Sequence, residues 1–185
     1  MKTALLFILL LILVPVAVSL QDMLPQLPPH QERILLLPLI FCFGVLALPL
    51  IPALFFALVV AVVQGLMFLQ IQSGEVELGL VGPVVFFLSW AIVLQMASEA
   101  TQGMRWELHA LGSASVTLTL LGGEFLILCA KRGGFPVDST VLLRIMIPSA
   151  LALLIAPLLY LSLRSLVPLV PEAGLAKLKA AGYDL

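Results

Sequence analysis

Residues 34–71 form a stretch of 38 positions that runs almost without interruption through apolar side chains. About 20 apolar residues are enough for one helix to cross the hydrocarbon core of a bilayer. The stretch is therefore too long for one span, and its length suits two. Pro49 and Pro52 cannot continue a helix. They predict a tight helical hairpin over residues 34–48 and 53–71.

The whole chain shares this apolar character. Of its 185 residues, 62% are hydrophobic and 10% are charged, whereas a soluble domain has roughly 45–50% apolar and about 25% charged residues. A soluble domain of this size would still need a polar surface, so the apolar side chains must face lipid. The net charge of −1 excludes the electrostatic footprint of a nucleic-acid binder.

Four further stretches are long and apolar enough for spans, and they predict helices over residues 3–20, 78–97, 108–130 and 141–163. The first could instead be a cleaved signal peptide, for which Ala17 and Ser19 make a poor cleavage signature. We therefore expect an all-α polytopic membrane protein, with six transmembrane helices and short loops in a single domain over residues 1–185. An amphipathic tail over residues 171–182 is expected to lie on the membrane surface.

Basic residues in the loops predict the orientation of this bundle. The side that holds both termini carries Lys2, Arg105, Arg164, Lys177 and Lys179. The other side carries Arg33, Lys131, Arg132 and Arg144. The positive-inside rule then favours cytoplasmic termini.

The span over residues 108–130 carries small or polar residues on two sides. One stripe, at a spacing that lets helix backbones approach closely in lipid, consists of Gly112, Ser115, Thr119 and Gly122. A second stripe, roughly 150° away at 100° per residue, consists of Ser113, Thr117 and Glu124. These two stripes predict that the helix lies at the centre of the bundle.

Glu124 and Arg144 are the charged residues placed deepest in predicted spans. They enter from the same membrane face at similar depths, and an unpaired charge there costs at least a few kcal/mol. We therefore expect an ion pair between them, acting either as a packing clamp or as a proton or ligand site. Gln64 and Gln95 are expected to form interhelical hydrogen bonds, and His109 is expected at the membrane interface.

The sequence contains no motif that carries catalysis. It lacks the zinc-protease HExxH, a nucleophile turn of the GxSx type and the phosphate-binding GxxxxGK[ST]. The cysteines Cys42 and Cys129 lie in apolar runs, and His30 has no second ligand nearby, so neither a metal site nor a cofactor is expected. An intramembrane enzyme that depends on Glu124 alone is the weakest alternative.

The order of several features resembles the MreD family of bacterial rod shape-determining proteins, which are small six-helix membrane proteins. The features are Leu20-Gln21 followed by Leu24-Pro25; an apolar hairpin from Pro38 to Gln64; Gln64-Gly65 followed by Leu78-Gly79-Leu80; and a last span with Leu143-Arg144, Pro148-Ser149-Ala150-Leu151 and Ala156-Pro157-Leu158-Leu159-Tyr160. The chain departs from the family at Gln64, where an acidic residue is common, and in its single Arg164 directly after the last span.

The resemblance implies a non-catalytic scaffold in the bacterial cytoplasmic (inner) membrane. Its partners would be the lipid bilayer, an MreC-like protein and, through it, the peptidoglycan synthase complex and the actin-like filament. A competing hypothesis is the substrate-binding subunit of a vitamin-type importer of the energy-coupling-factor class, which has a similar size. In that case Gln64, Glu124 and Arg144 would line a ligand pocket beside the acidic loop at Glu75 and Glu77.

Overall fold

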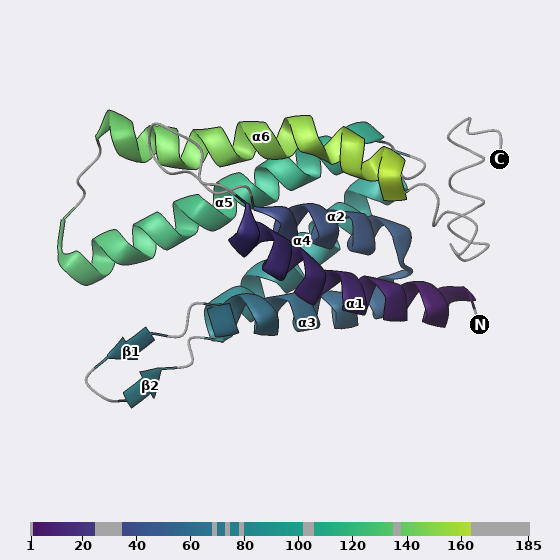
Figure 1. Cartoon of the computed structure of the whole chain (residues 1–185), viewed down its shortest axis with the longest axis horizontal. Helices are drawn as coiled ribbons and strands as arrows, with labels where there is room; N and C mark the ends of the chain where they lie inside the picture. Colours follow the sequence, from purple (N-terminus) through teal and green to yellow (C-terminus); the bar gives the residue numbers. More distant parts are fainter. Residues whose placement is uncertain are drawn as a thin grey trace.

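A computed structural model describes residues 2–24, 35–67, 70–72, 75–77, 80–101, 106–134 and 138–163. These residues form six helices and one small antiparallel hairpin of two strands (Figure 1). The elements in chain order are α1 (Lys2–Met23), α2 (Leu36–Ala47), α3 (Leu50–Met67), β1 (Gln70–Gln72), β2 (Glu75–Glu77), α4 (Val81–Ala100), α5 (Trp106–Arg132) and α6 (Ser139–Leu163).

Four of the helices, α1, α4, α5 and α6, are long and apolar enough to cross a membrane. The other two are shorter, and α2 has 12 residues. At 1.5 Å per residue α2 is roughly 18 Å long, which is less than the roughly 30 Å of a hydrocarbon core. The six predicted helices are therefore present, whereas four of them have the length of a span.

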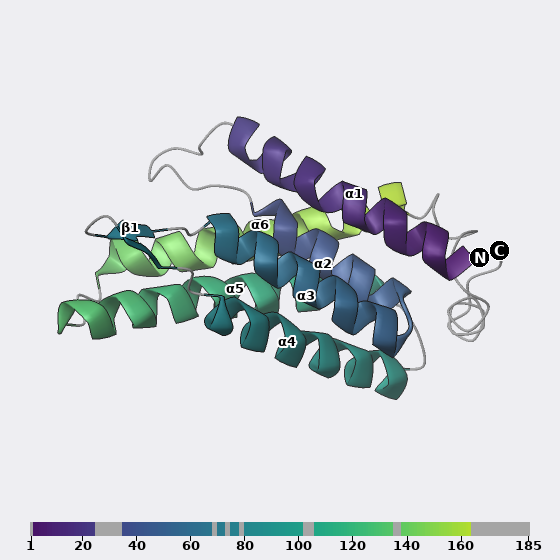
Figure 2. The same ribbon diagram turned by 90° about the horizontal axis from the view of Figure 1, so that it is seen from below.

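Helix α2 occupies the centre of the bundle. Every residue of α2 after Leu36 is buried, and α2 contacts α1, α3, α4, α5 and α6. Figure 2 shows it enclosed between α1 on one side and α4 and α5 on the other. The prediction that the span over residues 108–130 is central was therefore wrong, because α5 exposes one face, on which Leu111 is 61% exposed.

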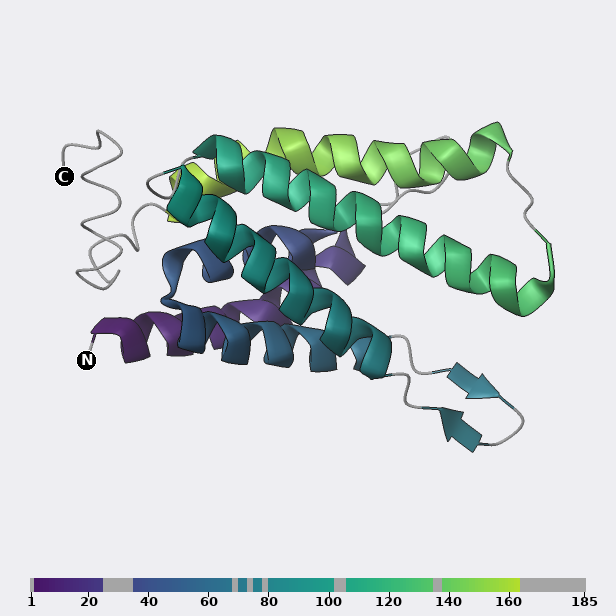
Figure 3. The same cartoon turned by 180° about the vertical axis from the view of Figure 1, so that it is seen from behind.

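Helices α5 and α6 pack along each other more extensively than any other pair. Figures 1 and 3 show that this antiparallel pair extends past α2 at the end that holds the β hairpin. The first turn of α1 and the last turn of α6 both lie at the opposite end of the bundle. An arrangement with the chain ends on one side was expected for this fold.

Only one of the two prolines that were expected to separate α2 from α3 lies between these helices. Leu48 is extended, Pro49 accepts a hydrogen bond from the Ala53 amide at 2.9 Å, and Pro52 lies inside the first turn of α3. A proline is tolerated there because its missing N–H would have no intrahelical partner in any case. Thus Pro49 alone divides the apolar stretch.

Other connections are defined by short-range signals. The expected acidic loop forms the β hairpin, in which Gln70 pairs with Glu77. Gly133 ends α5 with φ of 69°, a conformation that glycine adopts without steric cost. Asp138 precedes α6 and accepts hydrogen bonds from the Ser139 hydroxyl at 3.1 Å and the Ser139 amide at 2.6 Å, and these bonds lower the pKa of its carboxyl. The predicted tail over residues 171–182 lies outside the described residues.

Candidate functional site

The buried helix α2 needs hydrogen-bond partners at both of its ends. The first amides and last carbonyls of any helix have no partner within the helix, and lipid supplies none. Each unsatisfied buried group costs free energy, so neighbouring side chains are expected to provide the missing bonds. Three side chains, Gln21, Gln95 and His109, bond to the backbone of α2.

Gln95 of α4 serves the carboxyl-terminal end of α2. Its side-chain Nε2 donates to the carbonyl oxygens of Val45 and Leu48, the latter at 2.9 Å. The Val45 carbonyl would normally receive the amide of residue 49, but that residue is a proline and has no N–H. The side-chain amide of Gln95 is 6% exposed. The expected interhelical hydrogen bond of Gln95 is confirmed, with backbone carbonyls as acceptors.

Gln21 of α1 serves the opposite end of α2. Its Oε1 accepts a hydrogen bond from the Leu36 amide at 3.1 Å, while Leu35 at the cap position contributes no side-chain bond. Sequence reasoning placed Gln21 in a loop after the first span, yet α1 continues to Met23. The sequence did offer a signal for this position. Gln21 directly follows an apolar run, which indicates a continuing helix with Gln21 facing the bundle rather than water.

His109 of α5 lies between two other helices, and each of its ring nitrogens is within hydrogen-bond distance of a carbonyl oxygen. Its Nδ1 lies 3.1 Å from the Ala156 carbonyl oxygen of α6, and its Nε2 lies 3.0 Å from the Leu39 carbonyl oxygen of α2. The side chain is completely buried between these helices, which the prediction of an interfacial residue did not include. His109 stands four positions before Ser113, and this helical spacing would have added it to the polar stripe of α5.

The second predicted stripe of α5 does face the protein interior. Ser113 and Thr117 have no exposed surface, and the Thr117 hydroxyl donates to the Ser113 carbonyl at 2.7 Å. The Ser113 hydroxyl lies beside the Cys42 thiol of α2, although its oxygen makes no hydrogen bond within the described part of the chain. This stripe therefore faces α2.

Glu124, at the far end of the same stripe, is half-buried. The polar group that acts on its carboxyl is the side chain of Gln64, from α3. Arg144 is exposed on α6, and no ion pair between Glu124 and Arg144 is found among the described residues. The structure thus brings Glu124 together with Gln64, two of the three residues that the importer hypothesis placed in one pocket.

The predicted small-residue stripe of α5 is packed at one end and open at the other. A Cβ atom placed on Gly112 would lie 2.8 Å from Leu94 Cδ2 of α4, so the glycine permits close helix packing there. Gly122 has no neighbour within 4 Å of the same position. Between them, the exposed Thr119 bonds back to its own helix, to the Ser115 carbonyl at 2.7 Å.

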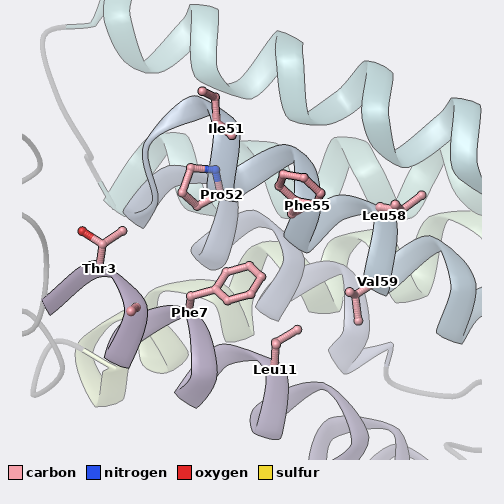
Figure 4. Close-up of a pocket in the computed structure, with 9 residues that line it drawn as sticks. Thr3, Phe7, Leu11, Ile51, Pro52, Phe55, Leu58 and Val59 are labelled. Carbon is pink, nitrogen blue, oxygen red and sulfur yellow. The ribbon is translucent and has the colours of Figure 1, made fainter. Parts of the chain in front are cut away.

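A pocket of about 500 Å³ lies on the outer side of the bundle between α1 and α3 (Figure 4). Its walls are apolar, with Phe7 and Leu11 on α1 facing Phe55 and Val59 on α3. Neither Gln64 nor Glu124 lines this pocket. Within the described ranges, no three His, Cys, Asp or Glu residues lie close enough together to hold a metal ion.

In comparisons with known proteins, no family model, no curated protein and no solved structure matches the chain. Its function is therefore inferred from the contacts around α2 and from the sequence resemblance.

Proposed function

We propose that this chain is a non-catalytic membrane scaffold of the MreD type, acting in the bacterial cytoplasmic membrane. In this role it would bind an MreC-like protein and, through it, connect peptidoglycan synthases to the actin-like filament. The observation that supports the proposal most directly is that residues which carry the family resemblance make interhelical contacts.

Three of the four matching features coincide with such contacts. Gln21 caps α2 at Leu36. A Cβ atom on Gly65 of α3 would lie 2.5 Å from Leu80 Cδ2, so Gly65 lets α3 pack against the residue that precedes α4. In the last span, the Ala156 carbonyl oxygen lies 3.1 Å from His109 Nδ1. The Tyr160 ring makes a tilted contact with the His109 ring, at 5.9 Å between centroids.

The use of the interior polar groups also favours a scaffold. Gln21, Gln95 and His109 form hydrogen bonds with backbone atoms of α2, which stabilises the helix arrangement. Large apolar surfaces remain on α5 and α6, including Leu126, Leu154 and Leu158. Such surfaces suit contact with lipid and with a partner's transmembrane helix.

The test is reconstitution with the partner. The full chain would be co-expressed with the MreC-like protein of the same genome and purified in nanodiscs, with an unrelated six-helix membrane protein carrying the same tag as the control. We expect a stoichiometric complex with this chain and none with the control, and loss of rod shape when the chain is depleted from cells. Failure to form the complex, together with unchanged cell shape, would contradict the scaffold proposal.

A second candidate function rests on the contact between Gln64 and Glu124. A half-buried carboxyl beside an amide could bind a polar small molecule, as the importer hypothesis requires. Its test is thermal unfolding of the purified chain with individual vitamins, because a ligand at 100 times its Kd stabilises by about 2.7 kcal/mol. Stabilisation that is lost in Glu124→Gln, together with co-purification of an ATPase pair, would favour import over the scaffold.

A further inference from the structure

The two hydrogen bonds of the His109 ring cannot both form in the neutral side chain. A neutral imidazole has one N–H donor and one nitrogen acceptor, whereas the protonated ring has two donors. Both partners of His109 are carbonyl oxygens, of Leu39 at 3.0 Å and Ala156 at 3.1 Å, and both can only accept. The neutral ring can satisfy one of them, and its second nitrogen then directs a lone pair at the other oxygen.

The surroundings of His109 contain few groups that could replace the missing donor. Helix α2 contributes the Phe43 ring, at 6.1 Å between centroids, and α6 contributes the Tyr160 ring, at 5.9 Å. Tyr160 is the one titratable side chain that a described ring contact brings against His109. Glu107, on the same helix, is exposed, and Cys42 of α2 lies beside Ser113, one turn further along α5.

We propose that His109 is a proton-binding site that couples α2 to α6. A proton from the aqueous phase binds the free ring nitrogen, and the imidazolium then donates to both carbonyl oxygens. When the proton returns to water, one of the two bonds is lost. The ring lies near one end of α5, because His109 is three residues after the first residue of the helix, or roughly 4.5 Å along the helix axis.

The bond lies where α2 meets α6, and the fully buried side chains there are mostly small. They are Leu39, Ala152 and Ala156, with Ala110 of α5 beside them, and Leu36, Ile155 and Leu159 pack against them partly buried. Small side chains permit close approach but bury little area each. Loss of one His109 bond therefore loosens α6 at the turn around Ala156, ahead of the helix kink expected at Pro157.

The experiment can observe this ring alone, because the chain has two histidines. In the variant His30→Gln, purified at full length in nanodiscs and labelled with ¹⁵N-histidine, every imidazole signal comes from His109. We expect one protonated ring nitrogen at the upper end of a titration between about pH 8 and about pH 5 and two at the lower end. A ring that keeps one N–H, or keeps two, across the whole range would overturn the proposal.

A second measurement tests the coupling and separates it from simple protonation. Hydrogen exchange in α6 around Ala156 would be followed over the same range, relative to His109→Gln, whose amide can donate from one nitrogen only. For the amides around Ala156, the ratio of the exchange rate in the unchanged protein to that in His109→Gln should change several-fold at the pH where the ring titrates. The same ratio for the amides of α1 should stay constant. An unchanged ratio in α6 would show that the proton does not couple α2 to α6.

Discussion

Among the described residues, Gln95 supplies the side-chain hydrogen bonds at the carboxyl-terminal end of α2, and the replacement Gln95→Leu removes them. Leucine has nearly the same volume, so it fills the space between α2 and α4 without a large cavity. It leaves the carbonyl oxygens of Val45 and Leu48 without the donor that they share. Because α2 is buried, water cannot take the place of the amide.

Two independent scales set the size of the effect. A buried group left unsatisfied costs about 1–3 kcal/mol, which gives about 2–6 kcal/mol for two carbonyls. Hydrogen bonds between transmembrane helices are worth about 0.6 kcal/mol on average and about 1.7 kcal/mol at most, which gives about 1–3 kcal/mol for two bonds. The two ranges overlap, and we expect Gln95→Leu to lower the free energy of unfolding by about 2–3 kcal/mol.

The assay is reversible unfolding in mixed micelles, with helicity followed by circular dichroism. The matched control is Met96→Leu, which alters the next residue of α4 where the side chain is 65% exposed. Gln95→Glu adds a variant of the same shape whose ionised form has no donor, and it should destabilise at least as much as leucine. If Gln95→Leu lies within about 0.5 kcal/mol of Met96→Leu, then the two carbonyls do not depend on this amide and the reasoning is refuted.

Three further substitutions test other contacts of the bundle in the same unfolding assay. Gln21→Ala removes a helix cap, so it should cost about 0.5–2 kcal/mol and speed hydrogen exchange at the start of α2; unchanged exchange there would argue against the cap. Gly44→Ala forces a methyl group into the Phe56 ring and should cost about 1–3 kcal/mol. Gly122→Ala meets nothing within 4 Å and should stabilise by roughly 0.5–1 kcal/mol, so equal costs at the two glycines would contradict the packing. Ser113→Ala removes a buried hydroxyl that has no hydrogen bond in the described part of the chain, and it should raise stability by roughly 1 kcal/mol; a loss of similar size would reveal a partner.

The helices themselves follow from local properties of the sequence. Apolar length predicts where α1, α4, α5 and α6 lie, and Gly133, with its positive φ, follows the end of α5. What length alone misses is that an apolar helix can be a span or can be buried among spans, because both are apolar on every side. The twelve residues of α2 belong to the second class, and only their contacts with five other helices distinguish the two.

The polar contacts were predictable in part. A glutamine in an apolar span must find a partner, and Gln95 was expected to bond across helices. The identity of that partner depends on which carbonyl lacks a donor, and this in turn depends on Pro49, far away in the sequence. His109 was expected at the membrane interface because it lies close to a predicted helix start, and its burial was not predicted, although its four-residue spacing from Ser113 puts it on the buried face of α5.

The hydrogen bonds of Gln21 and Gln95 have one physical reason, which is the central position of the short helix α2. A short helix of roughly 18 Å among longer helices has end amides and carbonyls that its neighbours' side chains must satisfy where they are buried. A longer α2 would place its ends at the polar interface and would need none of the bonds from Gln21 and Gln95. The polar residues in the interior are therefore required by the length of α2, and any catalytic or ligand-binding role must be argued from groups that α2 does not use. Glu124 and Gln64 are the pair that remains, at the end of α5 beyond the reach of α2.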